Sequence, residues 1–152
     1  MQEQRRSRRI AMTPGERDGF LAGERTCRVA TANAAGPHLT ALWFVWDGEA
    51  LWLTSIVKSQ RWRDIERDPR VSVLVDTGEG FGELRGVELR GVAEPVGEIP
   101  RTGEPNEQLV EPERLFGDKY AGGSFGHDGR HAWLRVVPEK ITSWDFSKMA
   151  LG

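Results

Sequence analysis

A short turn in the first half of the chain gathers hydroxyl groups and cations. It follows a strand predicted over Leu51–Thr54 and precedes a helix predicted over Arg61–Arg67. The first turn of a helix has unpaired backbone N–H groups and carries the positive end of the helix dipole. Hydroxyls and cations beside such an end suit a phosphate group. The sequence therefore predicts a phosphate-binding turn built from Thr54, Ser55, Lys58, Ser59 and Arg61.

An ordinary surface helix would explain part of the same pattern. Arg63, Glu66 and Arg67 can be present only for solubility and for pairing along the helix face. The position of the turn directly after a buried strand favours a binding site, because the backbone there can fix the side chains. The residues alone leave both interpretations open.

The elements around the turn predict a mainly β protein, an antiparallel barrel with short helices. Thr13, Pro14 and Glu16 have the spacing of a capping box with proline at the first helical position, so a short helix should begin there and end near Gly23. A second helix is expected over Asn106–Tyr120, with a possible interruption at Pro112. Six or seven strands joined mainly by hairpins favour a barrel over a parallel sheet. The expected strands are Arg25–Ala32, His38–Trp46, Glu49–Thr54, Val71–Val75, Leu84–Val96, His131–Val137 and Lys140–Phe146, the last two separated at Pro138.

Two segments of this pattern suggest where the barrel is closely packed. The hairpin with Trp43, Trp46 and Trp52 is apolar on both faces, which places it in the barrel interior or at a dimer interface. Gly86 and Gly91 interrupt the long strand and predict a bulge, a bend or a close approach of a ligand. The glycine-dense segment 121–129 is expected to be a mobile surface loop.

Length and composition predict one ordinary soluble domain. The chain has 152 residues, a formal net charge of -2 and 29% charged residues, which argues against a surface built to bind polyanions. Residues 1–12 form an Arg-rich arm, expected to be flexible and solvated rather than a grip for nucleic acid or lipid, and residues 13–152 form the domain. No apolar run approaches a membrane span, and the lone Cys27 indicates a reducing cytoplasm.

Several common chemistries lack support in the sequence. The three histidines, His38, His127 and His131, lie on separate predicted elements without metal-ligand spacing, so no metal site is expected. No motif marks a nucleophile, and Cys27 within a strand is typical of a core residue. The glycines at 78, 80 and 82 do not lead into a helix and therefore do not form a dinucleotide fingerprint.

The order of several motifs resembles the pyridoxamine 5′-phosphate oxidase-like family of FMN-binding split β-barrels. The resemblance lies in Thr54-Ser55, in Ser59-Gln60-Arg61, and in the run from Ile65 through Asp68-Pro69-Arg70-Val71. Further on, Arg85-Gly86-Val-Glu-Leu-Arg-Gly91 and the closing segment Arg135–Trp144 resemble two later strands of the family. The resemblance as a whole spans roughly residues 13–146. Gln60 and Arg61 stand where the family has Arg and Lys, and we hypothesise that Lys58 replaces the missing cation.

This resemblance implies a cofactor site and its residues. The flavin ring would lie along the strand before the hairpin turn, with Trp43, Phe44 and Trp144 as walls and Trp144 approaching from the partner subunit. Arg85 and Gly86 occupy the place of family residues near the flavin. The implied cofactor-binding set is Leu39, Thr40, Ala41, Leu42, Trp43, Phe44, Thr54, Ser55, Lys58, Ser59, Gln60, Arg61, Arg85, Gly86 and Trp144.

The resemblance also implies a reaction and an assembly. The expected activity is hydride transfer between FMN, or the deazaflavin coenzyme F-420, and a small conjugated substrate, in a homodimer with its sites at the interface. The cofactor carries this chemistry, so no catalytic residue is identified. True pyridoxamine phosphate oxidases continue beyond the tryptophan with a substrate-binding segment, and the printed sequence ends at Gly152, so that activity is not expected. A flavin carrier or sensor without turnover is the alternative, and a haem-handling barrel is a third; substrate and direction of transfer stay open.

Overall fold

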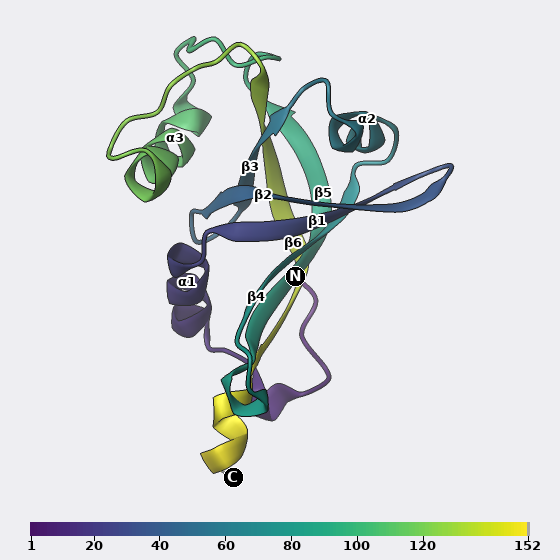
Figure 1. Ribbon diagram of the computed structural model, residues 1–152, viewed down its shortest axis with the longest axis vertical. Helices are drawn as coiled ribbons and strands as arrows, with labels where there is room; N and C mark the ends of the chain where they lie inside the picture. Colours follow the sequence, from purple (N-terminus) through teal and green to yellow (C-terminus); the bar gives the residue numbers. More distant parts are fainter. Residues whose placement is uncertain (152) are drawn as a thin grey trace.

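Six strands close into one antiparallel barrel, as predicted (Figure 1). The computed structural model describes residues 1–151, with side chains described through residue 149. The strands follow one another around the barrel in the order β1-β2-β3-β6-β5-β4. Their bounds are β1 (Thr26–Asn33), β2 (Gly36–Trp46), β3 (Leu51–Ile56), β4 (Arg70–Thr77), β5 (Arg85–Val96) and β6 (His131–Asp145).

Three α-helices lie outside the barrel. Helix α1 (Pro14–Gly23) begins with the predicted capping box, in which Thr13 and Glu16 exchange hydrogen bonds. Helix α2 (Gln60–Arg67) connects β3 to β4, and α3 (Glu107–Tyr120) runs without a break through Pro112, where the sequence suggested an interruption. Three short 3-10 helices, η1 (Arg8–Ile10), η2 (Phe81–Glu83) and η3 (Phe146–Leu151), complete the secondary structure of the described residues. No helix in this part of the chain is long and apolar enough to cross a bilayer.

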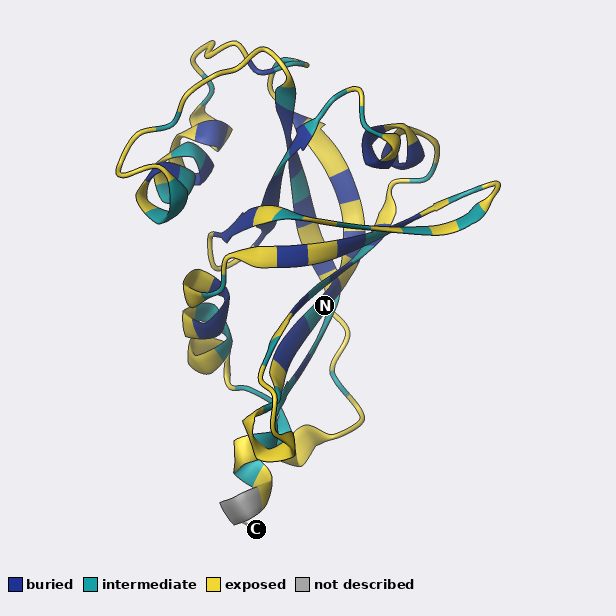
Figure 2. Cartoon of the chain, viewed as in Figure 1, coloured by how far each residue is buried: buried dark blue, intermediate teal, exposed yellow. Residues whose placement is uncertain are grey.

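The main core fills the barrel because alternate strand residues point inward. In β1 Cys27, Val29 and Thr31 are buried between exposed or half-buried neighbours, and β4 shows a similar alternation (Figure 2). Phe44 and Leu53 belong to this core. The interior is filled by side chains, so a ligand must bind outside it.

A second, smaller core lies between the outer face of the barrel and α3. It consists of Val45, Ala50, Trp52, Val96, Leu109 and Trp133. The sequence placed the tryptophan-rich hairpin inside a barrel or at a dimer interface. Its inner face, with Phe44 and Trp46, lies in the main core as predicted, whereas α3 covers Trp52 on its outer face. Trp46 and Trp52 are only 8% and 3% exposed within a single chain, so their burial requires no second subunit.

The last strand corrects the prediction of two strands separated at Pro138. β6 is continuous, and its pairing with β5 shifts register where Gly91 faces Pro138 and Arg90 faces Lys140. Proline has no N–H to give to the ladder, and the extra residue at Glu139 forms a bulge that accommodates it. Gly91 makes this possible, because a Cβ there would lie 2.5 Å from the carbonyl oxygen of Val137.

The N-terminal arm lies along β6. The backbone N–H of Gln2 donates to the carbonyl of Glu139 (2.7 Å). The side-chain amide of Gln4 donates to the carbonyl of Ser143 and accepts from its N–H, each at 3.0 Å. These bonds place the arginines of the arm beside the β5–β6 face.

Candidate functional site

One pocket of about 490 Å³ lies between the barrel, α2 and α3. This volume falls in the range of about 300–1,000 Å³ typical of small-molecule sites. Residues of β2 and β3 form its floor, and the segment after α3 closes the far side. Its lining comprises Ala41, Leu42, Trp43, Thr54, Ile56, Arg61, Arg101, Phe116, Phe125, Gly126, His127, Asp128 and His131.

Arg61 enters the pocket from α2 as a buried cation. It is only 9% exposed, and its guanidinium donates to Ser55 Oγ (3.0 Å, from Nε) and to Thr40 Oγ1 (2.8 Å, from Nη1). Among the described side chains no carboxylate forms an ion pair with it. Burial lowers the pKa of Arg61 below its usual value. A buried charge held only by neutral hydroxyls is unfavourable unless an anion completes the site.

The start of α2 explains why Arg61 occupies this position. Ser59 caps the helix, since its Oγ accepts from the N–H of Trp62 (3.1 Å) and donates to the carbonyl of Ile56 (2.7 Å). The cap fixes the first turn of α2 directly after β3. The side chain of Ser59 is thereby used within the protein, and Arg61, two residues further along, is the residue that faces the pocket.

A second anchor holds α2 against the β1–β2 hairpin. The carboxylate of Asp64 is fully buried and accepts from Thr31 (2.7 Å), Asn33 (3.1 Å) and Gln60 (2.8 Å). These bonds, the one from Gln60 foremost, lower the pKa of Asp64 to about 2. Gln60, predicted to contact the cofactor, instead uses its amide nitrogen to position α2.

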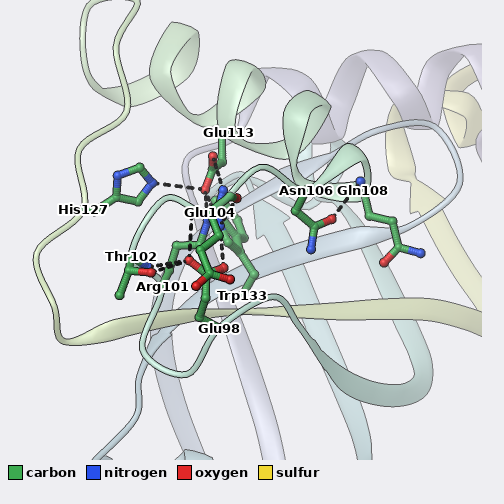
Figure 3. Close-up of polar contacts among 9 residues, drawn as sticks. All are labelled: Glu98, Arg101, Thr102, Glu104, Asn106, Gln108, Glu113, His127 and Trp133. Atoms are coloured by element: carbon green, nitrogen blue, oxygen red, sulfur yellow. Dashed lines mark hydrogen bonds and ion pairs between the residues drawn. The ribbon is translucent and has the colours of Figure 1, made fainter.

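At the α3 end of the pocket a second buried arginine has a different environment (Figure 3). Arg101 is 6% exposed and forms ion pairs with Glu113 (2.8 Å) and Glu98 (2.5 Å). Trp133 Nε1 donates to the same Glu113 carboxylate at 3.0 Å. The Glu113 hydrogen bond is the main cause that raises the pKa of Arg101. This network ties α3 to the segment before it and to β6.

Aromatic rings form the apolar wall of the pocket. Trp43 is 47% exposed and stacks on Tyr120, with ring centroids 4.3 Å apart and planes 8° apart. Phe116 and Phe125 meet edge to face at 5.4 Å and continue the wall toward Trp133. The segment 121–129, predicted to be a mobile surface loop, thus contributes Phe125 to the pocket. A flat, conjugated ligand suits such a wall.

His127 and Asp128 from the same segment, and His131 at the start of β6, also line the pocket. Asp128 accepts from the backbone N–H groups of Arg130 (2.8 Å) and His131 (3.1 Å), and its other oxygen lies 2.5 Å from His131 Nδ1. His127 lies 3.6 Å from Glu113. Within residues 1–149 no group of three His, Cys, Asp or Glu side chains is arranged to hold a metal ion.

The pocket brings together about half of the predicted cofactor-binding residues. Ala41, Leu42, Trp43, Thr54 and Arg61 line it, and Thr40 and Ser55 bind Arg61. Four other predicted residues between Leu39 and Arg61 do not line the pocket. Leu39 is 65% exposed and Lys58 is exposed, while the side chains of Ser59 and Gln60 form hydrogen bonds within the protein.

Phe44 does not form the wall that was expected of it. Its ring is fully buried in the main core, with Lys119 Nζ 4.0 Å from the ring centroid. Inward and outward residues alternate along β2, so Trp43 and Phe44 cannot both face one ligand. Only Trp43 lines the pocket.

Arg85, Gly86 and Trp144 lie elsewhere in the chain, on the paired strands β5 and β6. Gly86 faces Trp144 in the register, and a Cβ at Gly86 would lie 2.3 Å from the Trp144 ring. The missing side chain of Gly86 therefore makes room for this indole. Arg85 lies over the ring of Phe20 at 5.5 Å. None of the three lines the pocket within one chain.

Sequence reasoning missed Arg101, the aromatic wall of α3, and the Asp128–His131 pair. The sequence offers a local signal only for the last. An aspartate followed by Gly-Arg-His at the start of a strand has the spacing of a side-chain-capped turn.

Comparisons with known proteins agree with this architecture. Residues 13–145 match the family described as pyridoxamine 5′-phosphate oxidase. A conserved hypothetical protein from Mycobacterium tuberculosis, Rv2991, is 33% identical, with a TM-score of 0.81 and coverage of 98% of this chain and 94% of that chain. No curated protein matches the sequence at a significant level.

More distant structures share the fold. One described as an F420 reductase is 26% identical, with a TM-score of 0.60 over 82% of this chain and 94% of that chain. The haem storage protein HutZ from Vibrio cholerae is 19% identical, with a TM-score of 0.68 over 88% of this chain and 96% of that chain, and shows the fold alone. The family match spans nearly the whole barrel, and Rv2991 aligns over almost the full chain. This chain therefore belongs to the pyridoxamine 5′-phosphate oxidase-like family of split β-barrels.

Proposed function

We propose that this protein is an oxidoreductase that binds FMN or coenzyme F-420 in the pocket between the barrel, α2 and α3. The observation that carries the proposal is Arg61, a buried guanidinium that faces the pocket and is held only by hydroxyl groups. A phosphate would supply the missing negative charge, and charge-assisted bonds to phosphate are among the stronger hydrogen bonds in proteins. Both candidate cofactors contain a phosphate.

The remaining lining suits the rest of such a cofactor. The indole of Trp43, with Phe116 and Phe125, offers an apolar wall to a flat ring. The bound cofactor would supply hydride transfer, and the protein would supply position and a dry environment. The relative described as an F420 reductase supports the deazaflavin alternative within this family.

We further propose a homodimer, in which Trp144 of one chain approaches the pocket of the other. The support is the family resemblance together with the placement of Arg85, Gly86 and Trp144 away from the pocket of their own chain. Sedimentation with and without bound cofactor tests this assembly. A monomer that binds the cofactor with full affinity would contradict it.

The absorption spectrum of the purified protein tests the proposal. We expect a flavin or deazaflavin absorption band, or its appearance when FMN or coenzyme F-420 is titrated into colourless protein. A protein that binds neither would contradict the proposal. A Soret band instead of either would identify a haem-handling barrel.

A non-catalytic carrier or sensor is the second candidate, because cofactor binding alone does not require turnover. Reduction of the bound cofactor without oxygen, followed by a panel of quinones, enones and nitro compounds, separates the two. Saturable oxidation of the cofactor identifies an enzyme. A carrier would show no saturable reaction with any member of the panel.

A further inference from the structure

The pocket contains a carboxylate–imidazole pair that cofactor binding leaves unexplained. Asp128 is fixed by the backbone N–H groups of Arg130 and His131, which accounts for one of its oxygens. The other oxygen lies 2.5 Å from Nδ1 of His131. Both side chains line the pocket that holds Arg61. The imidazole is therefore held through one nitrogen, and Nε2 is left for a ligand.

Strand pairing places this histidine on the floor of the pocket. His131 begins β6 and faces Ile56 at the end of β3, and two residues earlier on β3 Thr54 lies on the same face. The backbone carbonyl of His131 accepts from the N–H of Arg101 (2.8 Å), so the strand end that carries the imidazole is itself held in place. The ring is 34% exposed, which leaves it in exchange with solvent protons.

The chemistry of the pair is that of proton transfer. A carboxylate beside Nδ1 fixes the ring orientation and makes Nδ1 the protonated nitrogen of the neutral ring, so Nε2 can accept or give a proton. The backbone N–H of Arg130 is the main cause that lowers the pKa of Asp128, which favours the charged carboxylate beside the ring. The second pocket histidine, His127, lies beside Glu113, which already binds Arg101 and Trp133.

We propose that His131, oriented by Asp128, is the residue that exchanges the proton accompanying hydride transfer in this pocket. This inference rests on the proposed oxidoreductase function and adds a catalytic residue and a substrate class, the α,β-unsaturated carbonyl compounds and related acceptors. The reduced cofactor supplies a hydride, with two electrons, to the carbon remote from the carbonyl. The electrons of the C=C bond form the new bond between the carbon next to the carbonyl and a proton given by Nε2 of the doubly protonated ring, which returns to the neutral form protonated at Nδ1. The substrate gains two hydrogens, and His131 regains its proton from solvent.

The first experiment uses the protein without added cofactor. Nitrogen-15 NMR of the imidazoles should show neutral His131 protonated at Nδ1. In Asp128→Asn the new amide keeps an oxygen for the backbone bonds but presents N–H groups to the ring, so the proton should move to Nε2. A wild-type ring protonated at Nε2, or a proton position unchanged in Asp128→Asn, would overturn the proposed pair.

The second experiment uses protein loaded with whichever of FMN and coenzyme F-420 binds. After reduction it is mixed with 2-cyclohexenone, menadione or 4-nitrobenzoate, and the acceptor reduced fastest by the wild type is used. His131→Ala should bind the cofactor within about twofold of wild type but oxidise it about 100-fold or more slowly, the usual share of a general acid. Added imidazole should restore part of the rate, which a merely structural role would not allow.

His127→Ala is the matched control, because it removes a histidine from the same pocket. Its oxidation rate should not respond to imidazole. A normal rate in His131→Ala with normal cofactor binding would overturn the role of His131 and leave the proposed function intact. A wild type that binds neither cofactor, or reduces none of the acceptors, would overturn both.

Discussion

The two ends of the pocket each contain a buried arginine, and the two differ in their partners. At the α3 end, Arg101 is 6% exposed and its charge is balanced by Glu98 and Glu113. At the α2 end, Arg61 is 9% exposed and contacts only the hydroxyls of Ser55 and Thr40. Accordingly, the Glu113 bond raises the pKa of Arg101, whereas burial lowers that of Arg61.

The two arginines differ in whether the chain itself balances their charge, and we propose that a ligand balances that of Arg61. A buried cation needs a counter-charge, and Arg101 obtains it within the chain. Arg61 does not obtain one among the described side chains, although its α2 helix is firmly positioned by Ser59 and Asp64. Burial alone thus says little about function. The missing counter-charge supports the proposal that the cofactor phosphate binds at the α2 end of the pocket.

The largest expected effect is on stability and belongs to Arg101. Arg101→Met would leave two carboxylates in a mostly buried environment, so the free energy of unfolding should fall by about 3–5 kcal/mol. Urea denaturation measures this free energy of unfolding. Arg114→Met is the control, because Arg114 pairs with Glu111 and Asp118 on the exposed face of α3 and should cost at most about 1 kcal/mol. Equal losses in the two variants would refute the structural role of Arg101.

The next effect is on binding and belongs to Arg61. Arg61→Met removes a cation without orphaning a carboxylate, so the free energy of unfolding should stay the same or rise. Cofactor affinity should instead fall by about 1.5–3 kcal/mol, as for a hydrogen bond to a charged group. Titration calorimetry measures it, with Lys58→Met as the control, since Lys58 is exposed and does not line the pocket. If Lys58→Met weakens cofactor binding as much as Arg61→Met does, Arg61 has no special role in binding the cofactor.

The smallest effect is on stability in acid, and it tests whether Asp64 anchors α2 beside the pocket. The pKa of Asp64 is about 2 in the folded protein, below the value of about 3.9 for an unfolded aspartate. Its hydrogen bonds therefore stabilise the fold above about pH 4, and this contribution is lost as the pH falls toward 2. Unfolding measured across that interval should decline less steeply for Asp64→Asn than for wild type. Parallel declines would mean that Asp64 does not anchor α2.

The sequence was most informative where the structure depends on local contacts. The capping box at Thr13, the end of helix α2 at Arg67 and the strand around Cys27 each depend on neighbours in the chain, and all three are found. For the same reason the turn with Ser55 and Arg61 could be recognised before the fold was known.

The α3 end of the pocket could not be found in this way. Arg101 lies in a Pro/Gly-rich segment, and its partners become neighbours only when α3 folds over the barrel. The tryptophans of the hairpin indicated burial, which holds for Trp46 and Trp52, but not that α3 covers Trp52. Pro138 was read as a strand break because the compensating bulge requires Gly91, a residue far away in the sequence.

The most direct test of the account compares FMN with riboflavin, which has the same ring but no phosphate. Dissociation constants are measured for both ligands with wild type and Arg61→Met; if the protein selects the deazaflavin, coenzyme F-420 and its phosphate-free core replace them. We predict that wild type prefers the phosphorylated ligand by about 10-fold or more, and that Arg61→Met loses most of this preference while its affinity for the bare ring is little changed. An equal preference in both proteins would show that Arg61 does not bind the phosphate.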